Sequence, residues 1–334
     1  MEKRQPMKTM MNFTTSPEDT GRYASAEDLR AFYRSFGCNG LELMPTGEAD
    51  GGGIITPDMV VGLHLPRLSD WMDREEEYLL AHYRPVLDAA QRLGAEYVVF
   101  HAAQISDEEC FTYQMQHSDR EVADAVCSLV NRLLDGQPYT FYFLMENLWW
   151  PGLNFLDPRI TRRLLDGVHY SRKGLMLDTG HFLHTNHALH DQREAVAYLH
   201  DMLDRHGELA SWIRGLHLQQ SLTGAYVEEW LRREHPLSPD PEERFRQVYE
   251  HVFAIDRHLP FTDPGVRGLV ERIAPQYVTY EYITRDREEH ARYLRAGTEA
   301  LRGIRKTEKC AGEAAWVQAE ASQRRKQTSG RREA

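Results

Sequence analysis

The sequence predicts a single α/β domain built as a closed (β/α)8 barrel. Short apolar runs alternate with longer segments of helical periodicity, and this order repeats eight times within 334 residues. Alternation of this kind implies a parallel sheet covered by helices, and eight repeats in this length favour a barrel over an open doubly wound sheet. The expected strands are residues 7–13, 40–44, 60–65, 97–101, 141–146, 174–178, 213–218 and 277–283.

Helix signals separate these strands. One helical segment begins at Ser25, a favourable N-cap, and ends at Gly37, and a longer one ends at Gly94. No glycine-rich GxGxxG sequence follows the first strand, which weakens the alternative of a dinucleotide-binding fold.

Two segments depart from the repeat and set the expected domain boundaries. Residues 222–258 follow the seventh strand, are longer than a simple connection and contain two helical pieces around a proline-rich LSPDPE sequence. Such an insertion could cover the mouth of a site or support a subunit contact. We expect a flexible N-terminus at 1–6, the barrel at 7–304, and a disordered polar tail at 305–334.

Composition excludes several classes of protein. No stretch approaches the roughly 20 apolar residues that cross a bilayer, and the N-terminal residues lack the apolar run of a secretion signal, so we expect a cytoplasmic protein without a membrane partner. A net charge of −11 argues against nucleic acid as a partner. The scattered cysteines favour free thiols without an assigned role, and they are Cys38, Cys110, Cys127 and Cys310.

Several expected strands end in a residue that can bind a metal ion. The carboxyl ends of barrel strands share one face, so residues far apart in sequence converge there. Burying an unpaired carboxylate costs several kcal/mol unless a cation or hydrogen bonds compensate, and three strands carry such a carboxylate. With the histidine of the seventh strand they form an expected mixed oxygen and nitrogen site: Glu146, Asp178, His217 and Glu281.

Further metal-binding side chains lie close to the same strand ends. His64 and His101 end two other strands, His181 follows Asp178 by three residues, and Asp256 with His258 forms an Asp-x-His pair after the insertion. A lone histidine at a strand end is more often a hydrogen-bonded structural residue, and buried carboxylates can be paired with Arg or Lys. The joint presence of so many donors makes that structural interpretation less attractive than a metal site.

Three other residues are candidates for substrate contact. Trp149 and Trp150 directly follow the fifth strand, where a tryptophan can stack on a sugar ring or pack in the core. His184 lies close to the expected site, whereas its neighbours His187 and His190 fit a loop and helix start.

The ordered motifs resemble the xylose isomerase-like TIM barrels, the superfamily that holds sugar-phosphate isomerases, sugar epimerases and endonuclease IV. They span about residues 7 to 300. The motifs are GLELMP with Glu42, GLHLP with His64, LGAEYVVFHAA with His101, LMEN with Glu146, LDTGH with Asp178 and His181, GLHL with His217, DRHLP with Asp256 and His258, and YEYI with Glu281.

The resemblance implies two kinds of chemistry. In the isomerases and epimerases, the residues that match Glu146, Asp178, His217 and Glu281 hold one divalent ion, commonly Mn²⁺, Mg²⁺ or Co²⁺, and the two glutamates act as acid and base. In endonuclease IV-like members, the positions that match His64, His101, His181, Asp256 and His258 complete a zinc cluster that cleaves a phosphodiester.

The chain departs from both patterns. After His217 it reads LQQSLTG, without the Asp and Arg with which epimerases commonly grip substrate hydroxyls, and the insertion before Asp256 remodels the substrate side. The leading hypothesis is a metal-dependent isomerase or epimerase of a small sugar, sugar phosphate or polyol, and a second copy of the chain in a homo-oligomer is one partner that the insertion could serve. The alternatives are a multinuclear zinc phosphodiesterase and a barrel without catalytic activity.

Overall fold

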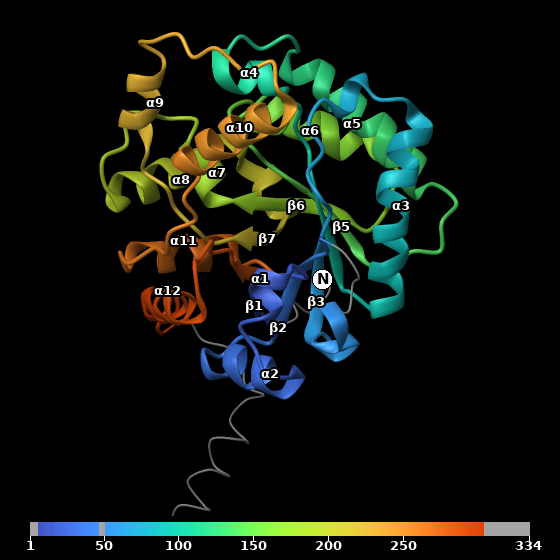
Figure 1. Cartoon of the computed structure of the whole chain (residues 1–334), viewed down its shortest axis with the longest axis vertical. Coiled ribbons are helices and arrows are strands. Elements are labelled where there is room, and N and C mark those ends of the chain that lie inside the picture. The colour runs from blue at the N-terminus through green and yellow to red at the C-terminus, as the bar shows by residue number, and fades with distance from the viewer. Residues whose placement is uncertain (1–5, 47–50, 304–334) are drawn as a thin grey trace, which may run out of the picture.

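Eight parallel strands close into a barrel in which each strand pairs with its neighbours in chain order and β8 pairs back with β1 (Figure 1). The computed structural model describes residues 6–46 and 51–303. The predicted fold class is therefore confirmed. The strands are β1 (Lys8–Thr14), β2 (Gly40–Met44), β3 (Val60–His64), β4 (Tyr97–His101), β5 (Tyr142–Glu146), β6 (Lys173–Asp178), β7 (Ile213–His217) and β8 (Tyr277–Tyr280).

Helices surround the strands and cover the outside of the barrel (Figure 1). Ser25 caps α2 by accepting from the backbone N–H of Asp28, and Gly94 ends α3 in the left-handed conformation, as the sequence predicts. The α-helices are α1 (Pro17–Thr20), α2 (Ala26–Ser35), α3 (Glu76–Leu93), α4 (Asp107–Thr112), α5 (Asp119–Leu134), α6 (Pro158–Gly167), α7 (Thr179–Leu183), α8 (Gln192–His206), α9 (Gly224–Trp230), α10 (Pro241–Ile255), α11 (Gly265–Ile273) and α12 (Arg287–Ala300). Four 3-10 helices complete the described elements: η1 (Gly51–Gly53), η2 (Pro57–Met59), η3 (Trp71–Asp73) and η4 (Gly207–Trp212).

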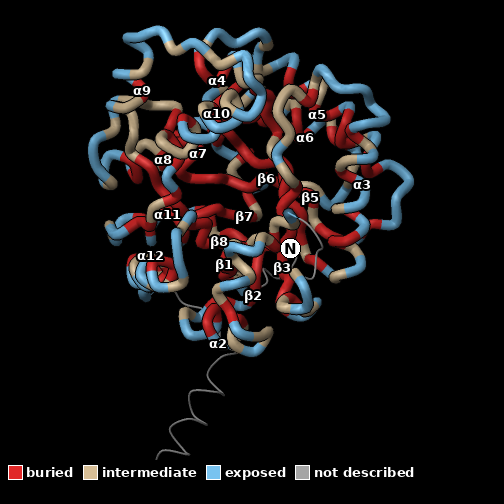
Figure 2. The backbone as a smooth tube through the Cα atoms, viewed as in Figure 1, coloured by how far each residue is buried: buried red, intermediate tan, exposed pale blue. Residues whose placement is uncertain are grey.

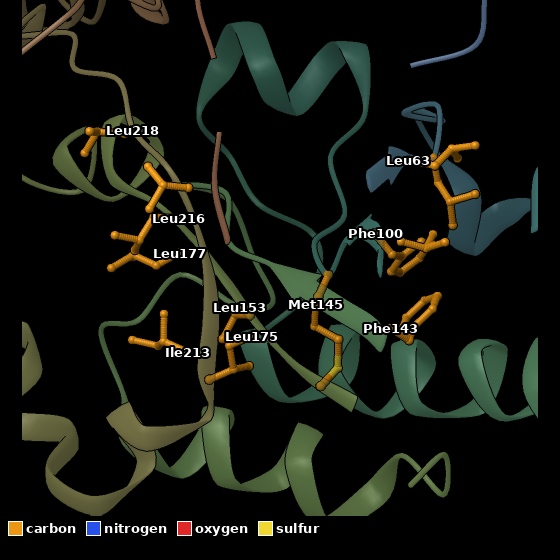
Figure 3. Close-up of a cluster of buried hydrophobic side chains, with 14 of the residues drawn as sticks. Leu63, Phe100, Phe143, Met145, Leu153, Leu175, Leu177, Ile213, Leu216 and Leu218 are labelled. Atoms are coloured by element: carbon orange, nitrogen blue, oxygen red, sulfur yellow. The ribbon is translucent and has the colours of Figure 1, made fainter. Parts of the chain in front are cut away.

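Two apolar layers hold the barrel together. Alternate strand residues point inward or outward, so each strand contributes to both layers. Figure 3 shows part of the outer layer, where Phe100 of β4 and Phe143 of β5 lie 5.8 Å apart between ring centroids. The inner layer contains Met10, Val61, Tyr97, Val99, Leu144, Met176 and Tyr277. Figure 2 shows that the strands are buried almost throughout, while exposed residues lie on the outer helices and loops.

The insertion forms the two helices that the sequence predicts, α9 and α10, although α9 ends at Trp230, earlier than the helical pattern indicates. Both helices lie beside α4 (Figure 1), and the indole N–H of Trp230 donates to the carbonyl oxygen of Phe111 at 3.0 Å. Val248 of α10 belongs to a small apolar cluster that includes Phe111 and Trp150. The insertion therefore packs over the loops that follow β4 and β5.

Strand ends differ from the expected positions by only a few residues. Glu281, predicted inside the last strand, lies directly after β8. Cys110 and Cys127 are buried free thiols, and no helix of the described chain is long and apolar enough to cross a membrane. The tail expected at 305–334, Cys310 and residues 1–5 lie outside the described residues.

Candidate metal centre

The predicted metal-binding side chains meet at the carboxyl-terminal end of the barrel. His64, His101, Glu146, Asp178 and His217 are the last residues of β3 to β7 in turn. The sheet register places His101 opposite Glu146 and Asp178 opposite His217. The sequence argument from converging strand ends thus describes the local geometry correctly.

Four of these side chains form one compact donor set. Donor atoms of Glu146, Asp178, His217 and Glu281 lie within 4.8 Å of one another, and all four residues are buried. His217 Nδ1 lies 2.9 Å from Glu146 Oε1, 3.2 Å from Glu281 Oε2 and 3.8 Å from Asp178 Oδ2. We call this group the central cluster.

A second group shares two residues with the central cluster. His64, Glu146 and His217 also bring one donor atom each within 4.8 Å. His64 Nε2 lies 2.9 Å and His101 Nε2 lies 3.3 Å from the same oxygen, Oε2 of Glu146. Glu146 therefore faces both groups, one with each carboxylate oxygen. We call the two histidines that contact this oxygen, together with Glu146 itself, the β3–β5 cluster (His64, His101 and Glu146). It shares Glu146 with the central cluster.

A third group is formed by His181, Asp256 and His258. Asp256 Oδ2 lies 3.1 Å from His181 Nε2 and 2.7 Å from His258 Nε2. His181 Nδ1 is also 3.4 Å from Glu146 Oε1, so this group adjoins the central cluster. We call it the Asp256 cluster.

Hydrogen bonds on the far side of three histidine rings determine which nitrogen faces the centre. His64 Nδ1 lies 2.7 Å from the backbone carbonyl oxygen of Leu65. His181 Nδ1 lies 2.9 Å from that of Asn147, and His258 Nδ1 lies 3.1 Å from that of Glu281. A carbonyl oxygen only accepts, so Nδ1 carries the hydrogen in each ring. Nε2 of the neutral ring is then the atom with a free lone pair, and a metal-binding histidine needs this arrangement.

The charge balance of the site also fits cations. Among the described residues, Glu146, Asp178, Asp256 and Glu281 form ion pairs only with histidines and with no Lys or Arg. Oδ2 of Asp178 and Oε2 of Glu281 are buried without a hydrogen-bond partner. Buried carboxylate oxygens in this state are costly unless a cation compensates, so the donor set fits a divalent metal such as Zn²⁺, Mn²⁺, Co²⁺ or Mg²⁺.

The carboxylates affect one another's protonation. Burial raises the pKa of Asp178 well above its ordinary value, and the negative charges of Glu281 and Glu146 add to this effect. Burial also raises the pKa of Glu146, but His217 and His101 outweigh it and hold that pKa well below its ordinary value. Burial lowers the pKa of His258, yet Asp256 reverses the shift and raises it to about 9. In the absence of a cation, charge in the centre is thus carried by carboxylate–imidazolium pairs.

The three residues proposed for substrate contact occupy different environments. Trp150 is buried in the apolar cluster below the insertion. Trp149 is partly exposed, and its ring centroid lies 5.4 Å from that of His181 and 4.7 Å from that of His184. His184 is buried, with Nε2 3.3 Å from Asp256 Oδ1, so it contacts the Asp256 cluster directly. Of the three, Trp149 has the partial exposure that a substrate contact needs.

Sequence reasoning missed three residues that position the donors. Asn147 accepts from the backbone N–H of Asp178 at 2.9 Å and donates to its carbonyl oxygen at 3.0 Å. Gln219 donates to Asp178 Oδ1 at 2.9 Å, and Glu42 contacts His217 from below the site. Asn147 directly follows a predicted ligand, and Glu42 stands in a motif noted for the family. Their positions in the sequence do not indicate that Asn147 pairs with Asp178 or that Glu42 contacts His217.

The family model described as xylose isomerase-like TIM barrel matches residues 54–302. The chain belongs to this family. The family includes isomerases, epimerases and hydrolases, so the chain is expected to be an enzyme. No curated protein matches the sequence.

Solved structures agree in fold at low sequence identity. A putative xylose isomerase from Rhodospirillum rubrum is 13% identical with a TM-score of 0.53, covering 90% of this chain and 99% of its own. A D-tagatose 3-epimerase-like protein is 14% identical with a TM-score of 0.51, covering 88% and 98%. The structure titled AsfvAP:AG is 12% identical with a TM-score of 0.53, covering 89% and 98%. Identities this low show a shared fold alone.

Proposed function

We propose that this chain is a multinuclear metal-dependent hydrolase of small phosphoesters. The observation that carries the proposal is that metal-binding side chains gather in three adjoining groups rather than one. The central cluster and the Asp256 cluster each bring their donor atoms within 4.8 Å of one another, and in the β3–β5 cluster His64 and His101 both contact Glu146 Oε2. In a mononuclear isomerase the central cluster alone would hold a cation, and the Asp256 cluster would hold none. The sequence alone ranks the isomerase first; because of the additional clusters, we place the hydrolase ahead of it in this proposal.

The residues of the chain have separable tasks in this proposal. The central cluster would hold one ion, the β3–β5 cluster a second, and the Asp256 cluster a third. When bound, divalent cations neutralise the charge of a phosphoester and activate it as Lewis acids. We assign to Glu281 the acceptance of a proton from an attacking water, because it is a carboxylate of the central cluster and would lie beside the bound ion. Trp149 would form one wall of the substrate pocket.

The acidity of the chain limits the substrate class. The net charge is −11, and extended nucleic acid requires a basic surface. A small phosphodiester or phosphomonoester needs only local charge compensation, which the bound cations supply. A long duplex is therefore a poorer match than a small phosphorylated molecule.

A metal-dependent sugar isomerase or epimerase is the second candidate. The observation that favours it is that two glutamates, Glu146 and Glu281, both belong to the central cluster. Two carboxylates beside one cation can move a proton between the faces of a substrate carbon. In that case the central cluster alone holds a metal, and the other histidines contact substrate hydroxyls.

Metal stoichiometry tests the choice between these two functions. We would measure metal content of the full chain by elemental analysis, together with cleavage of bis(p-nitrophenyl) phosphate and epimerisation of ketoses. Two or three ions per chain with phosphodiester cleavage supports the hydrolase, whereas one ion with sugar epimerisation supports the second candidate. A chain that binds no divalent metal at neutral pH contradicts both.

A single variant sharpens this test. His258→Gln removes a donor of the Asp256 cluster, so the hydrolase loses one bound ion and its activity, whereas a mononuclear isomerase retains its ion. His206→Gln is the matched control, because His206 is buried but hydrogen-bonds to Thr161 at 3.0 Å, away from the three clusters. An unchanged metal content in His258→Gln would exclude a metal in the Asp256 cluster.

A further inference from the structure

Glu42 is a buried carboxylate of β2 that none of the proposed metal clusters contains. It is only 2% exposed. Its Oε1 atom lies 2.8 Å from Nε2 of His217, and its Oε2 atom accepts hydrogen bonds from the hydroxyls of Tyr97 at 2.6 Å and Thr279 at 2.7 Å. Oε2 is thus hydrogen-bonded from two strands, and Oε1 contacts the imidazole of a third strand at ion-pair distance, without an aligned hydrogen bond at Nε2. No lysine or arginine of the described chain pairs with this carboxylate.

Gly62 of β3 leaves space for the Tyr97 side chain whose hydroxyl donates to Glu42. Glu42 is paired in register with Gly62 of β3, beside an irregularity in the β2–β3 pairing. A Cβ atom at Gly62 would lie 2.1 Å from Cζ and 2.4 Å from the hydroxyl oxygen of Tyr97. A side chain at this position would therefore displace the tyrosine that donates to Glu42. The arrangement is built into the barrel interior rather than formed by a mobile surface side chain.

The contact distinguishes His217 from the other histidines of the centre. His64, His181 and His258 each direct Nδ1 at a backbone carbonyl and Nε2 at the clusters. His217 is reversed, with Nδ1 facing Glu146 and Glu281 and Nε2 facing Glu42. The negative charge of Glu42 attracts the Nε2 edge of the ring at ion-pair distance, although Nε2 has no aligned hydrogen-bond partner, and this leaves Nδ1 directed at the cluster.

We propose that Glu42 is a positioning residue that holds His217 with Nδ1 directed at the central cluster, supported by the hydroxyls of Tyr97 and Thr279. This inference rests on the proposed metal site but is independent of whether the reaction is hydrolysis or isomerisation. Glu42 itself is not a ligand, because both of its oxygens are engaged on the side of His217 that faces away from the cluster.

The test is the metal affinity of Glu42→Gln, an isosteric change that removes the charge. We would measure the dissociation constant for Zn²⁺ by competition with a chromophoric chelator, and the visible absorption spectrum of the Co²⁺-loaded protein. Loss of a carboxylate partner of a metal-binding histidine typically weakens affinity by roughly 10–100-fold. We expect a loss in this range together with a changed Co²⁺ spectrum.

Glu289→Gln is the matched control. Glu289 is also buried, at 7% exposure. It lies in the first turn of α12, pairs with Arg285, and belongs to a helix that carries no proposed ligand. If Glu42 has only a structural role, Glu42→Gln lowers thermal stability and leaves Zn²⁺ affinity unchanged, as we expect for Glu289→Gln. Zn²⁺ affinity within twofold of the wild type, with an unchanged Co²⁺ spectrum, would overturn the positioning role of Glu42.

Two further variants cover the case in which Glu42→Gln does not fold. Tyr97→Phe and Thr279→Val each remove one donor to Glu42 and keep its contact with His217, so we expect several-fold weaker Zn²⁺ binding from each. If both bind Zn²⁺ as the wild type does, the inference fails. Failure of the proposed metal site is a separate result, because the wild-type chain itself would then bind no metal.

Discussion

Gln219 donates a hydrogen bond from Nε2 to Asp178 Oδ1 at 2.9 Å. The same nitrogen lies 3.3 Å from Asp256 Oδ1, so one buried amide connects the central cluster to the Asp256 cluster. A Cβ atom at Gly180 would lie 2.0 Å from Gln219 Oε1, so glycine at that position makes room for the amide. Gln219 thus determines the spacing between two carboxylates that belong to different proposed metal sites.

Gln219→Ala should weaken metal binding at both of these clusters. Without the amide, Asp178 and Asp256 lose a shared donor, and we expect roughly tenfold lower affinity for Zn²⁺ by chelator competition. Gln220→Ala is the control, because the Gln220 amide donates to the carbonyl oxygen of Pro260 and contacts neither carboxylate. Equal affinities of the two variants would show that Gln219 does not position the carboxylates.

Glu281→Gln should remove turnover while preserving the fold. Burial raises the pKa of Glu281, but His217 and His258 outweigh it and hold that pKa below its ordinary value, so the carboxylate is ionised at neutral pH. Loss of a general base typically costs roughly 10²–10⁴-fold in rate. We would measure kcat of the metal-loaded protein and the melting temperature. Retained activity in the loaded variant would exclude Glu281 as the base.

Metal removal should destabilise the protein. Four carboxylates lie in the three clusters, and a cation that binds only the folded state adds about 2.7 kcal/mol at a free concentration of 100 times its Kd. For a chain of this size we expect treatment with a chelator to lower the melting temperature by roughly 4 °C for each ion removed. Scanning calorimetry with and without added Zn²⁺ measures the difference, and an unchanged melting temperature would contradict a metal bound in the buried clusters.

The sequence predicts the barrel and its ligand face because both depend on local patterns. Apolar runs identify the strands, and a carboxylate at the end of an apolar strand, such as Glu146 or Asp178, requires compensation wherever the strand lies. In a parallel barrel the strand ends necessarily converge. The sequence alone therefore suffices to assign these proposed metal-binding side chains to one site, without any interatomic distance.

The positioning residues could not be predicted in the same way. Glu42 lies 175 positions before its partner His217, and their contact depends on barrel closure and on the register of β2. The nitrogen that each histidine presents depends on which carbonyl oxygen lies behind the ring, as for His181 and Asn147. The directions of these side chains divide the proposed ligands into three clusters. The order of the same residues along the sequence does not reveal this division.

His251 of α10 packs against other residues of the insertion and against Phe111 of α4, whose ring centroid lies 5.2 Å from that of His251. It is 2% exposed, its ring centroid lies 3.9 Å from that of Trp230, and its Nδ1 atom lies 3.0 Å from the hydroxyl oxygen of Tyr226. Burial, with a smaller contribution from His235, lowers the pKa of His251 to about 4 from the ordinary value of 6.5. The folded insertion therefore accommodates the neutral imidazole.

This shift predicts that acid loosens the insertion. Above pH 6.5 the ring is neutral whether the insertion is folded or open, so His251 adds no pH dependence there. As pH falls from 6.5 towards 4, only the open form takes up a proton, and the folded form loses up to about 3 kcal/mol of relative stability. We expect limited proteolysis to cut within residues 222–258 faster at pH 5 than at pH 7.5. His251→Gln should reduce this pH dependence and His190→Gln, at an exposed position, should not; equal cleavage of the wild type at both pH values would contradict the prediction.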